Sequence, residues 1–297
     1  MNKTSQVLII AAAACWGIVG VFTRPLISAG FSYTEMAAAR SFITLACIFI
    51  FLLVTDREKL RVNKKDLWMF VCMGGIGFSM FNIVYFQAIH LITLSAACIL
   101  LYTAPFMVVL ISPLVFKDRI TLQKICALFV AFTGCVMTVG YIDSSGISLP
   151  GVLSGLAAAF CFSQYTIFGK FALKKYHPFT VIVYTFIAAL LAVTPFCNIE
   201  NVIALAGASA YNLANLLAIG FFSTLIPFLC YTKGLEKTEP GRAMIIAFAE
   251  PLVASVAGVV VYGEMLSAVK ISGMALIFAA LVILNLKHSE KISPPKQ

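Results

Sequence analysis

The hydrophobic residues of this chain fall into ten long runs, which short polar segments separate. Each run holds about 20 mainly apolar residues, the length that an α-helix needs to cross the hydrocarbon core of a bilayer. The pattern therefore predicts ten transmembrane helices, with edges good to about three residues. Their expected ranges are 6–27, 33–54, 67–89, 93–115, 121–140, 149–170, 178–197, 211–233, 240–262 and 267–286.

The composition indicates an integral membrane protein rather than a soluble one. The 297 residues are 61% hydrophobic and 11% charged, whereas soluble domains carry about 25% charged residues. A net charge of +9 can indicate nucleic-acid binding, but here the basic residues lie in short loops between the apolar runs, where membrane topology explains them. We therefore expect a lipid bilayer around the protein and no nucleic-acid partner.

The second half of the chain repeats the first half at a constant offset of 146 positions, as from Pro105 to Pro251. Unrelated apolar helices share leucine and valine by composition, but they do not share proline, tyrosine, glycine and charge at one offset. An internal duplication in a membrane chain is typical of transporters whose site lies between the halves. Further matching pairs are Tyr85 with Tyr231, Gly74 with Gly220, Arg24 with Lys170, Asp118 with Glu264 and Lys124 with Lys270.

The loop charges and the number of helices predict the topology. Nearly all of the 21 lysines and arginines lie on one side of the membrane if both termini are cytoplasmic, as the positive-inside rule requires. Each half holds five helices, an odd number, so the two copies must cross the membrane in opposite directions. We expect an all-α, multi-pass protein of the cell (plasma or inner) membrane, built from two inverted five-helix repeats. Their expected ranges are 1–142 and 147–287, and a cytoplasmic tail follows at 288–297.

Several short motifs lie inside the predicted helices. They are Trp16-Gly17, Ala39-Arg40-Ser41-Phe42, Thr103-Ala104-Pro105, Glu250-Pro251-Leu252-Val253-Ala254 and Gly263-Glu264. Together with the five-plus-five arrangement, they resemble the EamA branch of the drug/metabolite transporter superfamily. The resemblance implies a secondary carrier, commonly an exporter of amino acids or other small metabolites, and no particular substrate. The first repeat departs from the motif, because Ala104 stands where the second repeat has Glu250.

Two charged side chains, Arg40 and Glu250, fall well inside predicted helices. A charge near the bilayer centre costs about 2.5–3.5 kcal/mol on insertion scales, so both are candidates for function. Glu250 lies about 15 Å along its helix, near the midplane, where it could bind a substrate ammonium group, exchange a proton or form a structural hydrogen bond. Arg40, about 10 Å from its helix end, could snorkel to the surface, pair with Glu250 or bind an anion.

Prolines and polar or aromatic residues mark further candidate positions. Pro105 and Pro251 lie at equivalent midplane points, and each frees the carbonyl four residues earlier, at Leu101 and Ala247. Matching interruptions point to a binding or gating site, although a static kink would have the same sequence. A polar, aromatic cavity lining is the other expectation, with interface anchoring as the alternative. The candidates for this lining are Trp16, Asn82, Tyr85, Tyr102, Gln164 and Tyr231.

The chain shows no catalytic motif, so we expect neither an enzyme nor a cofactor. The nine cysteines lie mostly in apolar runs and predict neither a disulfide nor a metal site. The leading hypothesis is a secondary active transporter that exports a small metabolite, such as an amino acid, by alternating access. A proton is a candidate coupling ion, and the protein could act as a monomer or a homodimer. The alternative is a lipid-handling or flippase-like protein of the same architecture.

Overall fold

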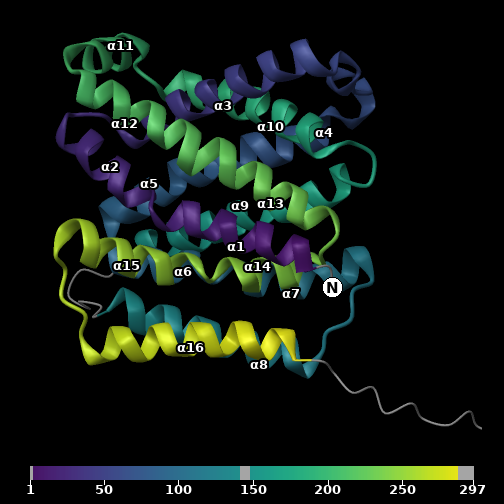
Figure 1. Cartoon of the computed structure of the whole chain (residues 1–297), viewed down its shortest axis with the longest axis vertical. Coiled ribbons are helices and arrows are strands. Elements are labelled where there is room, and N and C mark those ends of the chain that lie inside the picture. Colours follow the sequence, from purple (N-terminus) through teal and green to yellow (C-terminus); the bar gives the residue numbers. More distant parts are fainter. Residues whose placement is uncertain (1–2, 141–147, 287–297) are drawn as a thin grey trace, which may run out of the picture.

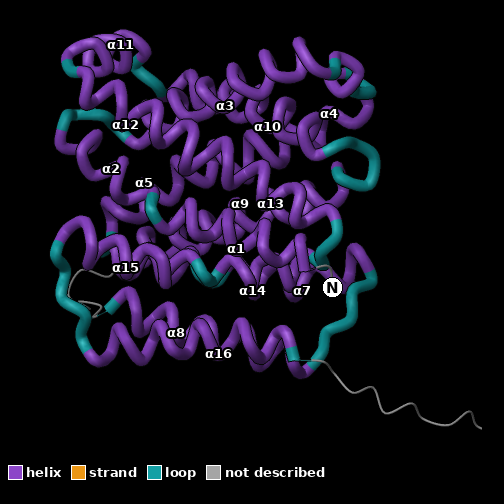
Figure 2. The backbone as a smooth tube through the Cα atoms, viewed as in Figure 1, coloured by secondary structure: helices purple, strands orange, loops and turns teal. Residues whose placement is uncertain are grey.

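The computed structural model describes residues 3–140 and 148–286, which form helices and connecting loops (Figures 1 and 2). In these residues, ten helical segments are long and apolar enough to cross a membrane. They agree closely with the ranges predicted from the sequence, and the all-helical membrane fold is confirmed. The predicted tail, 288–297, lies outside the described residues. The segments are spans 1 to 10: Lys3–Ser28, Tyr33–Thr55, Lys64–Leu91, Leu94–Phe116, Leu122–Val139, Leu149–Ala172, Pro178–Phe196, Ala210–Glu236, Pro240–Tyr262 and Ala268–Asn285.

Several spans contain more than one helical element. The elements of spans 1 to 5, with one connecting turn, are α1 (Lys3–Gly17), α2 (Val19–Ser28), α3 (Tyr33–Thr55), η1 (Arg57–Leu60), η2 (Lys64–Asp66), α4 (Leu67–Phe70), η3 (Val71–Met80), α5 (Phe81–Leu91), α6 (Leu94–Leu101), α7 (Ala104–Phe116) and α8 (Leu122–Val139). Those from span 6 onward are α9 (Leu149–Ala172), α10 (Pro178–Val193), η5 (Thr194–Phe196), α11 (Ile199–Ala208), α12 (Ala210–Gly220), η6 (Phe221–Leu225), α13 (Ile226–Glu236), α14 (Pro240–Ala247), α15 (Glu250–Tyr262) and α16 (Ala268–Asn285).

Hydroxyl side chains start equivalent helices in the two halves. Thr121 caps α8 by accepting a hydrogen bond from the Lys124 N–H, and Ser267 caps α16 by accepting one from the Lys270 N–H. These caps occupy the same place in the repeat, so the duplication extends to the local backbone. The helix α11, between spans 7 and 8, was not expected, because the sequence analysis assigned that segment to a short loop.

The two halves pack mainly against each other. Span 1 contacts spans 8 and 9, and span 6, its repeat counterpart, contacts spans 3 and 4. Span 2 contacts spans 7 and 8, and span 7 contacts spans 2 and 3. Spans 4 and 9 contact each other, as do spans 5 and 10, whose helices α8 and α16 lie together at one edge of the bundle (Figure 1). Each contact has its counterpart in the repeat, as two inverted repeats about a pseudo-two-fold axis require.

Three spans are interrupted near their middle. In spans 4 and 9 the first helix ends at Leu101 and at Ala247, the residues whose carbonyls the prolines were predicted to free. Pro105 and Pro251 are then the second residues of the next helices, where a missing N–H costs nothing. Span 1 is interrupted after Gly17 without a proline, and its counterpart, span 6, is one continuous helix.

Spans 3 and 8 contain π-helical stretches at equivalent places in the repeat. These are η3 (Val71–Met80) and η6 (Phe221–Leu225). In a π-helix the hydrogen bonds run to the fifth residue, and such stretches widen the helix and are frequent at functional sites. The sequence analysis did not predict them. Gly74, within η3, brings span 3 close to span 7, and Gly220, directly before η6, brings span 8 close to span 2.

Candidate functional site

The three interrupted spans meet around Glu250, the first residue of α15. A Cβ placed on Gly17, at the end of α1, would lie 2.7 Å from the Glu250 carbonyl oxygen, so the ends of these two helices are in direct contact. At the third interruption, the Tyr102 ring lies 5.9 Å from the Phe248 ring, measured between centroids. The breaks of spans 1, 4 and 9 therefore converge on one place in the bundle.

The Glu250 carboxylate has no partner of opposite charge. Within residues 3–140 and 148–286, no side chain donates a hydrogen bond to it and no cation lies within ion-pair distance. It does lie close enough to the Tyr85 and Tyr102 hydroxyls to act on them electrostatically. An unpaired carboxylate deep in an apolar bundle is costly. The arrangement can accept a proton or a positively charged ligand group.

Tyr85 and Tyr102 bring phenol groups to the same region from spans 3 and 4. The Tyr85 hydroxyl is 3.0 Å from the Cys98 sulfur, and its ring stacks on Phe81 with centroids 5.6 Å apart. Both tyrosines and Glu250 remain partly exposed, although they lie inside their spans. The structure therefore brings three of the predicted site residues together. The sequence analysis missed the contact with Cys98, because it treated the cysteines as apolar packing residues.

Arg40 points to span 3 rather than to Glu250. Its Nη2 donates a hydrogen bond to Asn82 Oδ1 at 3.1 Å, and its guanidinium lies 4.7 Å from the centre of the Phe78 ring. Its Nε is buried and, in the described residues, has no hydrogen-bond partner. Among the described residues, Arg40 and Glu250 form no direct ion pair. Phe78 was missed, although it lies one helical turn before Asn82 and therefore on the same face.

Trp16, Tyr231 and Gln164 pack into the bundle beside this region. The Trp16 ring lies 5.4 Å from Phe228 and 5.3 Å from Tyr231, between centroids. Tyr231 is 1% exposed, and its hydroxyl shares a 2.8 Å hydrogen bond with Thr166. Gln164 is also buried and donates to the Phe160 carbonyl of its own helix at 3.2 Å. Tyr231 and Gln164 thus have internal hydrogen-bond partners, whereas Glu250 has none within residues 3–140 and 148–286.

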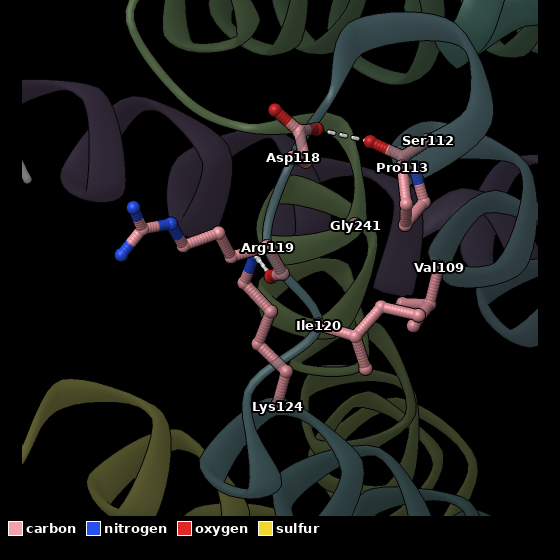
Figure 3. A pocket seen from close by; sticks show the side chains of 8 residues that line it. All are labelled: Val109, Ser112, Pro113, Asp118, Arg119, Ile120, Lys124 and Gly241. Atoms are coloured by element: carbon pink, nitrogen blue, oxygen red, sulfur yellow. Dashed lines mark hydrogen bonds between the residues drawn. The ribbon is translucent and has the colours of Figure 1, made fainter.

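Two surface recesses lie away from Glu250, near the ends of the spans. One is open, has a volume of about 510 Å³ and lies where spans 1, 8 and 9 end on the side opposite the N-terminus. It is lined by Arg24, Pro25, Ser28, Ala29, Tyr211, Asn212 and Tyr262. The other is small and lies between spans 4, 5 and 9, where Asp118 and Lys124 line it (Figure 3).

The arrangement of ten spans in two inverted halves, with interrupted helices around a half-buried carboxylate, is that of a membrane transporter. The model of the EamA-like transporter family matches residues 3–140 and again residues 149–286. The chain therefore belongs to the EamA-like transporter family, as its motifs suggested, and this is a family of transporters rather than enzymes.

Similar proteins cover nearly the whole chain. An uncharacterized transporter of Archaeoglobus fulgidus is 27% identical over 92% of this chain and 95% of its own length. The uncharacterized transporter YwfM of Bacillus subtilis is 25% identical, over 94% and 93% respectively. The pseudopaline exporter CntI of Pseudomonas aeruginosa is 24% identical, over 95% and 96%. A solved crystal structure matches with a TM-score of 0.78 and 18% identity, over 96% of this chain and 97% of that one, which supports the fold alone.

Proposed function

We propose that the protein is a secondary active transporter that exports a small metabolite, such as an amino acid, by alternating access. The observation that carries the proposal is the unpaired Glu250 carboxylate at the place where three interrupted spans meet. In transporters built from inverted repeats, substrate and coupling ions bind near the midplane between such helices. A relative that is named an exporter supports the outward direction.

Glu250 is the coupling residue in this proposal. It binds either the ammonium group of the substrate or a proton that moves against the substrate. Its repeat counterpart, Ala104, has no titratable group, so the site has a single carboxylate although the fold is duplicated. Tyr85 and Tyr102 supply hydroxyls beside it, and Trp16 supplies an apolar wall. Pro105 and Pro251 maintain the interruptions that leave room for the ligand.

Arg40 and Asn82 form the second polar group of the proposed site. The Arg40 Nε has no partner among the described residues, so the guanidinium has a donor available for an anionic ligand group. Asn82, which binds Arg40, is three residues from Tyr85 on span 3, so span 3 borders both the Arg40 group and the Glu250 group. The proposed substrate is a zwitterion whose ammonium group binds Glu250 and whose carboxylate binds Arg40.

The experiment is uptake into proteoliposomes across a panel of amino acids and nucleobases, with and without a pH gradient. Glu250→Gln keeps the size of the side chain and removes its charge, so it should abolish gradient-driven transport and leave insertion intact. Exchange without a gradient should survive if Glu250 carries the proton, and it should fail if Glu250 binds the ammonium group. The matched control is Glu58→Gln in an exposed loop. Gradient-driven transport at the wild-type rate in Glu250→Gln would contradict the proposal.

A second comparison tests Arg40. Arg40→Gln should raise KM for a zwitterionic substrate and leave KM unchanged for its amine analogue without the carboxylate. Arg40→Lys keeps the charge but loses the planar arrangement of donors, so its effect should be intermediate. An equal loss for both substrates would assign Arg40 a structural role against Phe78 and Asn82.

A further inference from the structure

A charged cluster joins the two halves on the side opposite the N-terminus. We call its residues Arg24, Tyr262, Glu264 and Lys270 the far cluster. Glu264 follows α15. Its carboxylate accepts a hydrogen bond from Arg24 Nη2 at 3.0 Å and forms an ion pair with Lys270 Nζ at 3.6 Å. The Arg24 guanidinium also lies 4.2 Å from the centre of the Tyr262 ring. The far cluster therefore holds span 1 of the first half against spans 9 and 10 of the second.

The repeat places an equivalent set of residues on the N-terminal side. Phe116, Asp118, Lys124 and Lys170, the near cluster, are the counterparts of Tyr262, Glu264, Lys270 and Arg24. The two loops begin with the same backbone conformation. Lys117 and Gly263, at equivalent positions, both end their helix in the left-handed region, with φ of 59° and 67°. The carboxylates of Asp118 and Glu264 therefore follow equivalent turns. Each also has an equivalent lysine in its own half, Lys124 and Lys270 respectively.

The near cluster nevertheless makes different contacts. Asp118 accepts a hydrogen bond from Ser112, in its own turn (Figure 3). Lys170 instead donates to three carbonyls at the end of α13, those of Leu235, Glu236 and Thr238, at 2.9, 3.0 and 2.8 Å. No cation of the described residues pairs with Asp118, although Asp118 is close enough to act on Lys170 electrostatically.

Lys124 also has a different partner from its counterpart Lys270. It pairs with Glu239 and donates to the Arg119 carbonyl at 2.7 Å. The counterpart of Glu239 in the first half is Thr93, which is neutral, and in the described part of the chain Lys270 pairs with Glu264. Lys124 therefore pairs with Glu239 rather than with Asp118, although Asp118 and Lys124 line the same small recess. Lys170 donates to neutral carbonyls here, and the Asp118 carboxylate lies near enough to be its alternative partner.

We propose that the far and near clusters are two gates that exchange during transport. When the Arg24–Glu264 ion pair opens, Lys170 leaves the carbonyls of span 8 and pairs with Asp118. The inference rests on the proposed alternating access, in which each half adopts in turn the arrangement that the other half has now. Under that exchange, the contact between Arg24 and Glu264 becomes a contact between Lys170 and Asp118. Arg24 then turns to the carbonyls at the end of span 3, the counterparts of those that hold Lys170.

Cysteine cross-linking in native membranes tests the exchange without any substrate. The nine native cysteines are replaced, and a protease site is placed between spans 5 and 6. One variant carries Arg24→Cys with Glu264→Cys, and the other carries Asp118→Cys with Lys170→Cys. A disulfide then keeps the two halves joined after proteolysis. We expect both pairs to cross-link. Cross-linking of the first pair together with none of the second would overturn the proposal.

The link between the gates is tested by changing one gate and measuring the other. Glu264→Gln should speed cross-linking of the Asp118–Lys170 pair, and Asp118→Asn should speed cross-linking of the Arg24–Glu264 pair. The expected change in each cross-linking rate is roughly two- to fivefold, the size of the contribution of an exposed ion pair. Glu58→Gln, the matched control, should change neither rate. Equal rates in the wild-type and altered backgrounds would contradict the exchange.

Transport by the chain with its native cysteines gives an independent measurement. It does not require the cysteine-free chain to fold. Asp118→Asn keeps an oxygen that can accept the hydrogen bond from Ser112 and removes only the charge. If Asp118 served only to hold its own turn through Ser112, transport by this variant would be unchanged. We expect slower transport, with recovery in the charge exchange Asp118→Lys with Lys170→Asp. Cross-linking at both gates without transport of any panel member would contradict the proposed substrate class alone. Transport without the second cross-link would contradict the gates alone.

Discussion

Tyr102 and Phe248 occupy the same position in the two repeats, and their rings face each other with centroids 5.9 Å apart. A contact between a residue and its own counterpart must straddle the pseudo-two-fold axis that relates the halves. Each of the two follows directly on the end of a helix, α6 at Leu101 and α14 at Ala247. The axis therefore passes between the two interruptions, and Glu250 lies two residues beyond it on span 9.

The contact between Gly17 and Glu250 makes a prediction about packing at this centre. A Cβ on Gly17 would lie 2.7 Å from the Glu250 carbonyl oxygen and 3.0 Å from the Ala254 nitrogen, and backbone atoms cannot yield. Gly17→Ala should therefore separate spans 1 and 9 and destabilise the protein by about 1–3 kcal/mol. Thermal unfolding of the detergent-solubilised protein measures the loss.

Gly20→Ala is the matched control for Gly17→Ala. Gly20 lies on the same span, and a Cβ there would have nothing within 4 Å. The alanine should leave the unfolding temperature unchanged or raise it, since glycine weakens a helix by about 0.5–1 kcal/mol. Equal unfolding temperatures for the two alanine variants would show that the contact with Glu250 is not tight.

A second prediction concerns the π-helical stretch of span 3. A Cβ on Gly74 would lie 2.0 Å from the Thr185 carbonyl oxygen of span 7, whereas a Cβ on Gly75 would meet only side-chain atoms at 3.8 Å or more. Gly74→Ala should lower expression of folded protein, and Gly75→Ala should not. Size-exclusion profiles of the two variants measure this. A Gly74→Ala profile like that of the wild type would mean that span 3 can shift away from span 7.

Much of this architecture could be predicted because its causes are local. Long apolar runs fix the spans, and one gapless offset fixes the duplication. Proline removes a donor wherever it occurs, so Leu101 and Ala247 could be named in advance as the residues whose carbonyls are freed. The charges of Arg40 and Glu250 could be recognised for the same reason, since a charge inside a long apolar run is unusual whatever its partner.

What could not be predicted depends on contacts between distant segments. The interruption after Gly17 has no proline, and it lies where α15 packs against it. The partner of Arg40 is Asn82, 42 positions along the chain, and periodicity on one helix does not say which neighbouring helix it faces. The different partners of Lys124 and Lys270 arise from Glu239, which has no acidic counterpart in the first half.

The two left-handed turns give a third prediction. Lys117 has a positive φ of 59°, a conformation that costs a residue with a Cβ about 1–2 kcal/mol, while its counterpart Gly263 adopts it without penalty. Lys117→Gly should therefore raise the unfolding temperature, and Gly263→Ala should lower it. The opposite signs distinguish backbone strain from a loss of side-chain contacts. A Lys117→Gly variant less stable than the wild type would mean that the Lys117 side chain contributes more than the strain costs.

The far cluster gives a prediction of pH dependence. The hydrogen bond from Arg24 holds the pKa of the Glu264 carboxyl below its ordinary value of about 4.3. A lowered folded-state pKa means that the folded state favours the ionised carboxylate. The contribution of Glu264 to stability is therefore fully present above the ordinary pKa. It is lost as the pH falls through the lowered one.

The measurement compares the wild type with Glu264→Gln by thermal unfolding in detergent over a range of pH. The difference in unfolding temperature should be constant from pH 8 to about 5 and should shrink only below about pH 4, where the wild-type carboxylate is protonated. High salt should reduce the difference at neutral pH, because the ion pair is partly exposed. The exposed control Glu58→Gln should show no such profile. A difference that disappears between pH 7 and 5 would mean that Arg24 does not stabilise the ionised form.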